Sequence, residues 1–260
     1  MHLSRRHFIG VVGAAAVAGA AGLGKRTGTV AYVGSYSSTG GAGLALADVD
    51  PATGTLTVTS TVPGVPDASW LALSHDRRLL YATNEQDPVG SVTALDRTHS
   101  VVLNQQSTEG DTPTHLSVHP SGRYLLTANY GSGSVAVFPL AADGRIEPLS
   151  DLVQHAGTQP HAHQIITDPT GRWVLAVDLG NESVYVYQLE AGKLRQHQQL
   201  VVATGTGPRH LVFHPSGQHA YLVCENKSQV IVCAWDAQRG ELSAGEIIST
   251  VEPDAVAPNF

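Results

Sequence analysis

Three histidines recur at similar places along the chain. His115, His163 and His210 lie five, six and five residues before the proline of a short turn, Arg209 precedes the last of them, and His161 lies two residues before the second. An imidazole can act as a general base, and a guanidinium can stabilise a developing oxyanion. These residues could therefore supply a general base, an oxyanion partner and orienting groups, provided that the fold brings them to one place.

A repeat in the sequence predicts such a fold. A strand–turn–strand unit occurs four times, at Leu71–Glu85, Leu116–Tyr130, Ile165–Leu179 and Leu211–Glu225. Equivalent turn positions lie 45, 49 and 46 residues apart, a period that is typical of β-propellers. An alternating third strand follows each unit, at Ser91–Leu95, Ser134–Leu140, Ser183–Leu189 and Gln229–Trp235. A less regular fourth strand completes each blade, as after Gly144 and Gly192.

We therefore expect an all-β propeller with four-stranded antiparallel blades over residues 29–251, followed by an irregular tail over residues 252–260. The first copy begins with a second strand, Tyr32–Ser35, and no first strand precedes it. A closed ring would take the missing strand from the C-terminus, but the tail contains no new repeat. The sequence thus predicts four full blades, one three-stranded blade and an open ring.

The propeller architecture gives these candidate residues one common location. The innermost strand of a blade begins, and the second strand ends, at the same mouth of the central funnel. His115, His163, His210 and Arg209 precede first strands, and further polar residues follow second strands: Asn84, Glu85, Asn129, Tyr130, Asp178 and Glu225. Asn or Asp at a strand end can also bond its own turn, and a repeated His can tie adjacent blades together. The joint placement favours a site at this mouth.

Composition and motifs argue against several other functions. The chain has 15 Lys and Arg against 22 Asp and Glu and no basic stripe, so nucleic acid is not an expected partner. His161-Ala162-His163 has no third ligand at zinc spacing, so no metal is expected. Gly205-Thr206-Gly207 lacks the Lys-Ser/Thr of a phosphate loop. Cys224 and Cys233 are interpreted as apolar strand residues, with a disulfide as the alternative.

The N-terminus indicates export. Ser4-Arg5-Arg6-His7-Phe8 precedes a mildly apolar Ala/Gly/Val stretch that extends to about Gly24. This pattern resembles a twin-arginine signal, which we assign to residues 1–28, and it predicts a periplasmic or otherwise exported protein. An N-terminal anchor helix is the alternative, but the stretch is short and weakly apolar for a membrane span. Contact with the membrane is then expected only during export.

Several segments resemble the lactonase-type seven-bladed propellers, the family of bacterial 6-phosphogluconolactonase and of carboxymuconate-lactonising enzymes. They are Tyr32-Val33-Gly34-Ser35-Tyr36, Ala128-Asn129-Tyr130-Gly131-Ser132-Gly133-Ser134-Val135, Pro160-His161-Ala162-His163 and Gly207-Pro208-Arg209-His210-Leu211. The resemblance extends from about Thr29 to Val251. Because family members continue with two more blades and a closing strand, it implies that this chain is a C-terminally shortened propeller.

The resemblance also implies an activity. The family's enzymes open or form lactone rings without a cofactor, and their proposed active residues match His161 or His163, Arg209 and Glu225. We thus expect a 6-phosphogluconolactonase-like hydrolase with a small-molecule lactone as substrate, bound also by His115, Asn129, Tyr130, Asp178 and His210. An exported protein would instead meet an unphosphorylated lactone. A muconate-type lactonising isomerase, a non-catalytic binding propeller and an inactive fragment are the alternatives.

Overall fold

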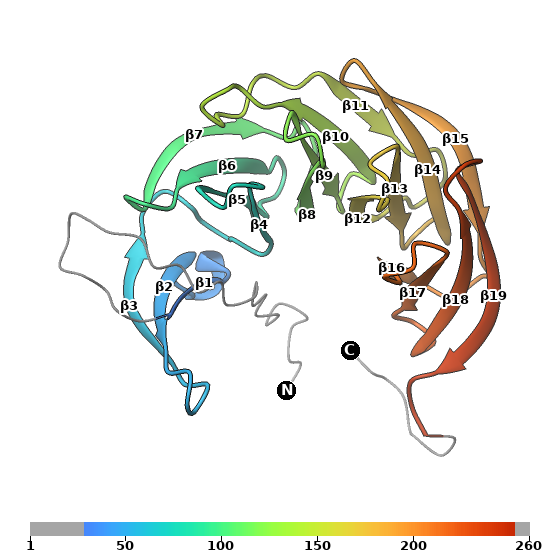
Figure 1. Ribbon diagram of the computed structural model, residues 1–260, viewed down its shortest axis with the longest axis horizontal. Coiled ribbons are helices and arrows are strands. Elements are labelled where there is room, and N and C mark those ends of the chain that lie inside the picture. Colours follow the sequence, from blue (N-terminus) through green and yellow to red (C-terminus); the bar gives the residue numbers. More distant parts are fainter. Residues whose placement is uncertain (1–28, 253–260) are drawn as a thin grey trace.

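In the computed structural model, which describes residues 29–252, five antiparallel sheets form an open arc (Figure 1). Each sheet is one propeller blade, and its first strand lies on the inside of the arc. The all-β propeller prediction is confirmed, as is the open ring, which has its gap between blades 1 and 5. The predicted signal segment lies outside the described residues. Within residues 29–252, no helix is both long enough and apolar enough to span a bilayer.

Blade 1 has three strands, as expected. They are β1 (Thr29–Gly34), β2 (Leu44–Val49) and β3 (Leu56–Val62), with a 3-10 turn, η1 (Ser37–Thr39), after β1. Blade 2 comprises β4 (Leu71–Leu73), β5 (Leu79–Asn84), β6 (Ser91–Asp96) and β7 (Val101–Ser107). Blade 3 comprises β8 (Pro113–Val118), β9 (Tyr124–Asn129), β10 (Ser134–Pro139) and β11 (Asp151–Gln154).

Blades 4 and 5 have longer outer strands. Blade 4 comprises β12 (Ala162–Thr167), β13 (Trp173–Asp178), β14 (Ser183–Glu190) and β15 (Lys193–Val201). Blade 5 comprises β16 (Pro208–Phe213), β17 (His219–Cys224), β18 (Gln229–Asp236) and β19 (Glu241–Ser249). The expected fourth strand of blade 3 is interrupted: after a single bridge between Leu140 and Ile146, pairing resumes only at β11.

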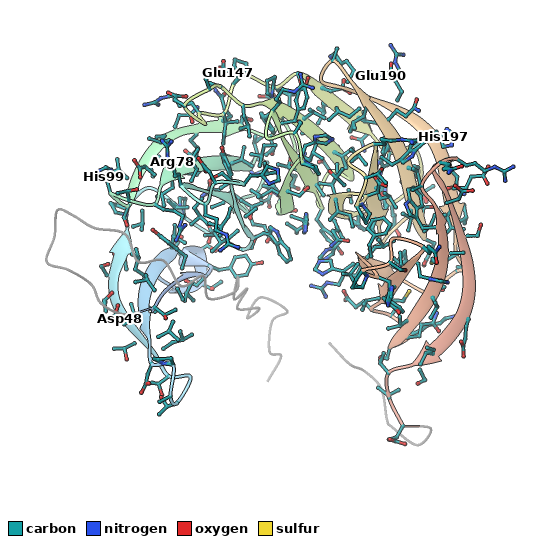
Figure 2. All side chains as sticks on the ribbon, viewed as in Figure 1. Asp48, Arg78, His99, Glu147, Glu190 and His197 are labelled. Carbon is teal, nitrogen blue, oxygen red and sulfur yellow. The ribbon has the colours of Figure 1, made fainter. Side chains whose placement is uncertain are left out.

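The hydrophobic core lies between neighbouring blades. One cluster joins Leu175 and Val186 of blade 4 to Leu222 and Ile231 of blade 5, and similar clusters fill the other three interfaces. Strand residues alternate in direction, so each central sheet presents apolar side chains to both neighbours. Figure 2 shows side chains filling the spaces between sheets, while the labelled Glu147, Glu190 and His197 lie on the outer edge. The blades thereby hold their first strands around one axis.

Candidate active site

A β-bulge lies at the start of the innermost strand in blades 3, 4 and 5. Ala162 pairs with Asp178, but Gln164 pairs with the next residue of β13, so His163 is an extra residue. The same shift makes Thr114 of β8 and Arg209 of β16 extra residues. A bulge redirects the side chains around it. By register, His163 therefore corresponds to Arg209, while His115, Gln164 and His210 occupy the following position.

Aromatic rings from four blades meet at the axis below this mouth. The ring centroids of Trp70 and His115 are 4.3 Å apart, and those of Trp70 and His210 are 5.5 Å apart. His210 also lies 6.0 Å from His115 and 5.1 Å from His163. The structure thus brings together the three histidines of the repeat, with Trp70 occupying the equivalent place in blade 2.

These three imidazoles are held in their neutral form. Burial, with smaller contributions from neighbouring imidazoles, lowers the pKa of His115 well below its usual value. Burial and the charge of Arg209 do the same to the pKa of His163, and they lower the pKa of His210 to about 4. His163 is 8% exposed, and its Nδ1 has no hydrogen-bond partner among the described residues. At neutral pH the floor of the funnel is therefore uncharged.

Two side chains of the axis also join consecutive blades. The backbone N–H of Ile165 donates to Nδ1 of His115 at 3.4 Å, and the N–H of Leu211 donates to Oε1 of Gln164 at 2.6 Å. Both acceptors come from the same register position and reach the innermost strand of the next blade. His115 thus contributes to blade docking as well as to the floor of the funnel.

Arg209 and Glu225 form an ion pair at the mouth. Nη1 of Arg209 donates to Oε2 of Glu225 at 2.6 Å, and their side chains are 35% and 17% exposed. The carboxylate holds a guanidinium that is near enough to His163 and His210 to influence their pKa values. The pair thus holds a guanidinium close to two of the neutral rings.

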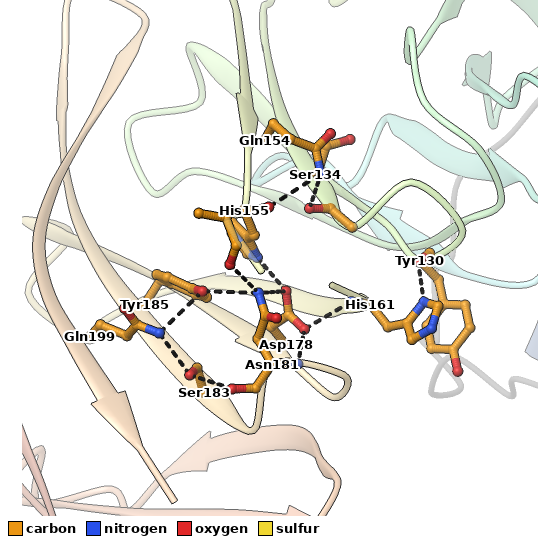
Figure 3. Close-up of polar contacts among 12 residues, drawn as sticks. Tyr130, Ser134, Gln154, His155, His161, Asp178, Asn181, Ser183, Tyr185 and Gln199 are labelled. Atoms are coloured by element: carbon orange, nitrogen blue, oxygen red, sulfur yellow. Dashed lines mark hydrogen bonds and ion pairs between the residues drawn. The ribbon is translucent and has the colours of Figure 1, made fainter. Parts of the chain in front are cut away.

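His161 lies beside the same group, between blades 3 and 4. Its Nδ1–H donates to the backbone oxygen of Tyr130 at 2.9 Å, and its ring stacks on the Tyr130 ring at 4.5 Å and 15° (Figure 3). The Tyr130 ring also makes an edge contact with His163 at 5.6 Å. A carbonyl can only accept, so the proton occupies Nδ1 and the lone pair of His161 is on Nε2.

Two predicted substrate-binding residues are fully buried with internal partners. Asp178 accepts from the N–H of His161 and of Asn181, both at 2.8 Å, and from Nδ1 of His155 at 2.6 Å (Figure 3). Nδ2 of Asn129 donates to Oγ of Ser134 at 3.0 Å. The structure therefore places both side chains beneath the mouth, where Asp178 orders the loop that carries His161.

The structure adds further polar contacts at this end. The hydroxyl of Tyr36 donates to Oε2 of Glu85 at 2.8 Å, and Glu85 stands after β5 where Glu225 stands after β17. The hydroxyl of Tyr187 donates to Nε2 of His155 at 3.0 Å. Glu85 had a sequence signal, its repeat position at the end of a second strand, whereas Gln164 was indicated only by the six-residue spacing of His163 from its proline.

The described residues contain no group of three or more His, Cys, Asp or Glu side chains arranged to hold a metal ion. Cys224 and Cys233 are free thiols and buried, and burial raises their pKa values to about 12 and about 11. The site consists of imidazoles, a guanidinium, carboxylates and aromatic rings. Such groups can accept a proton and stabilise an oxyanion.

Known proteins resemble this chain in sequence and in architecture. Residues 30–259 match the family described as lactonase, 7-bladed beta-propeller. A 6-phosphogluconolactonase of Bacillus subtilis is 30% identical over 86% of this chain and 68% of its own length. Another, of Pectobacterium carotovorum, is 34% identical over 74% of this chain and 58% of its own length.

Solved structures of similar proteins have the same fold. The periplasmic gluconolactonase of Pseudomonas aeruginosa has a TM-score of 0.78 at 29% identity, covering 87% of this chain and 69% of that chain. A Lactobacillus plantarum protein has a TM-score of 0.79 at 30% identity, covering 88% and 69%. The chain thus spans about two thirds of the length of most of these proteins. It belongs to the lactonase family of seven-bladed β-propellers.

Proposed function

We propose that this protein hydrolyses the ring ester of a sugar-acid lactone at the mouth of the funnel. The observation that carries the proposal is the Arg209–Glu225 pair close to neutral imidazoles, in a chain of the lactonase family. Two relatives named 6-phosphogluconolactonase and a neighbour titled gluconolactonase support the same chemistry. The substrate class is a small cyclic ester of a polyhydroxy acid.

The geometry suits a general-base mechanism. Nε2 of His161 takes a proton from water as the water oxygen bonds to the lactone carbonyl carbon, and Arg209 stabilises the resulting oxyanion. The ring C–O bond then breaks, and the departing alkoxide takes the proton back from the His161 imidazolium. The products are a carboxylic acid and an alcohol in one open chain. Glu225 keeps Arg209 in place throughout.

His161 suits the role of base better than His163. Its Nδ1–H is fixed by the Tyr130 carbonyl, which orients the ring and presents the Nε2 lone pair. A base is most effective when its pKa lies near the working pH, whereas burial and Arg209 lower the pKa of His163 well below that range. His163 instead contributes an uncharged imidazole that lines the site beside the lactone carbonyl.

Turnover of δ-gluconolactone and its 6-phosphate by variants of these residues tests the proposal. Arg209→Ala should lower kcat/KM about 100-fold or more, because one oxyanion donor is worth about 3 to 4 kcal/mol. Lys227→Ala, at the same end of blade 5, is the matched control and should retain wild-type rates. An unchanged rate in Arg209→Ala would refute the assignment, and a folded wild-type protein without turnover would favour a binding propeller.

The two histidines can be separated in the same assay. His161→Gln should reduce kcat about 100-fold or more and change KM little, because it removes the general base. His163→Gln should lower kcat far less, because burial and the charge of Arg209 make its imidazole a weak base. The reverse pattern would assign the base to His163.

We also propose that the protein is exported through the twin-arginine pathway. The Arg5-Arg6 pattern and the periplasmic Pseudomonas neighbour support this. Fractionation of cells that express the wild type or Arg5→Lys/Arg6→Lys tests it. Export of both proteins alike, or of neither, would contradict the proposal.

A further inference from the structure

The loops around the active-site mouth form one continuous rim. The N–H of Glu85 donates to the backbone oxygen of Asp67 at 3.0 Å, and the N–H of Thr112 donates to that of Gln86 at 3.0 Å. The N–H of Tyr130 donates in turn to the backbone oxygen of Thr112 at 2.9 Å. The bond from Nδ1 of His161 to the backbone oxygen of Tyr130 adds blade 4. Loops from blades 1 to 4 are thereby fastened to one another, so their charges lie along the same opening.

The charges on this rim are mainly negative. Its carboxylates are Asp67, Glu85, Asp87, Glu109, Asp111, Glu182 and Glu225. The described cations at this end are Arg209 and Lys227, and Arg209 is paired with Glu225. The other described Lys and Arg residues lie in or beside turns at the opposite end: Arg77, Arg78, Arg97, Arg123, Arg145, Arg172, Lys193, Arg195 and Arg239.

Two of these carboxylates, Asp87 and Asp111, influence each other between blades 2 and 3. Oδ1 of Asp111 is buried and has no hydrogen-bond partner among residues 29–252. Burial, with the charge of Asp87, raises the pKa of Asp111. A second anion brought to this part of the rim would meet carboxylates that already repel each other.

The floor of the same opening carries groups that suit an uncharged ring. The His163 side chain is more than nine-tenths buried, and its Nδ1 has no partner in the described part of the chain. Trp70 and His210 add aromatic surface beside it. Neutral imidazoles can exchange hydrogen bonds with hydroxyl groups, and aromatic rings cover the apolar faces of a sugar.

Resting on the proposed function, we infer that the mouth selects an unphosphorylated sugar lactone and disfavours its 6-phosphate. A phosphate monoester carries about −1.5 to −2 charges at pH 7. With its carbonyl at Arg209, the lactone would hold its 6-substituent among the rim carboxylates. The repulsion is screened by salt, since the Debye length is about 10 Å at 0.1 M and shorter above it. The inferred substrate differs from the one in the name 6-phosphogluconolactonase, which the Bacillus and Pectobacterium relatives carry.

The test compares kcat/KM for δ-gluconolactone and its 6-phosphate at low and high ionic strength. At low salt the unphosphorylated lactone should be preferred at least tenfold, and the ratio should shrink as salt is added. Asp87→Asn/Asp111→Asn should raise kcat/KM for the phosphorylated lactone severalfold without changing it for the other. Asp76→Asn/Asp143→Asn, with the same charge change at the opposite end, should leave the ratio unaltered.

Preference for the phosphorylated lactone would overturn the inference and leave the hydrolase proposal standing. The same holds if the ratio of the two kcat/KM values is unchanged in Asp87→Asn/Asp111→Asn. Failure of the folded protein to hydrolyse either lactone would refute the hydrolase proposal instead. In that case the inference is tested by calorimetry, which measures the affinity of the protein for 1,5-anhydroglucitol and for its 6-phosphate. Both ligands are ring ethers that cannot be hydrolysed. Tighter or equal binding of the phosphate would overturn it.

Discussion

Acid should destabilise this protein through the imidazoles at its axis. Burial lowers the pKa of His115 and of His163 well below the ordinary range, and that of His210 to about 4. In the unfolded chain a histidine titrates at about 6.5. Below pH 6.5 the unfolded state therefore binds more protons than the folded state, and the free energy of unfolding falls as the pH falls.

The size of the effect follows from the width of this pH window. Each imidazole that stays neutral in the folded state costs about 1.4 kcal/mol of unfolding free energy per pH unit below about 6.5. For His210 the window ends at about pH 4, so its total contribution is about 3 kcal/mol. The burial of His115 and of His163 acts in the same direction and steepens the slope further.

Urea unfolding followed by tryptophan fluorescence at pH 7.0, 5.5 and 4.5 measures this slope. His210→Gln should reduce the slope by about 1.4 kcal/mol per pH unit between about pH 6.5 and 4, and glutamine suits the position because Gln164 occupies the same register in blade 4. His75→Gln, which removes an exposed imidazole at the opposite end, is the matched control. Equal slopes in all three proteins would refute the reasoning.

Three further predictions concern the packed interior. Tyr187→Phe leaves Nε2 of buried His155 without its donor and should lower the free energy of unfolding in urea by about 1 to 3 kcal/mol; an unchanged value would contradict the bond. Gly34→Ala would bring a Cβ within 2.0 Å of a backbone oxygen, so its Tm in calorimetry should fall by several degrees. Cys224 and Cys233, buried and with raised pKa values, should resist Ellman's reagent at pH 8 until urea is added; rapid labelling without urea would show that blade 5 opens.

The repeat predicted most of the fold because each blade begins with the same strand–turn–strand unit. The alternation of Val135 and Val137 correctly identified β10 as a strand, but it predicted a half-buried one, whereas the structure buries β10 on both faces between neighbouring blades. The outer strand of blade 3 was less predictable. After Ile146 the chain bonds across to blade 2, where Nδ2 of Asn104 donates to the Ile146 backbone oxygen at 2.7 Å. A contact between blades has no periodic signal along the chain.

The candidate site was predictable in its location but not in its detail. Strand order alone placed His163, His210 and Arg209 at one mouth. The bulge, however, moved His163 into the register of Arg209, and the sequence showed this only as one additional residue before a proline. The bond between Asp178 and His155 was not predictable, because the equivalent positions of blades 2 and 4 hold Thr108 and Val202, so the repeat gives no reason to expect a histidine there.

The repeated bulge also has an evolutionary consequence. Thr114, His163 and Arg209 are extra residues that their blades absorb locally, while the strand beyond each bulge returns to regular pairing within two residues. A hydroxyl, an imidazole and a guanidinium thus occupy one position without altering the packing between blades. New reactivity could therefore arise by single substitutions at this position, one blade at a time, while the interfaces that keep the propeller folded remain intact.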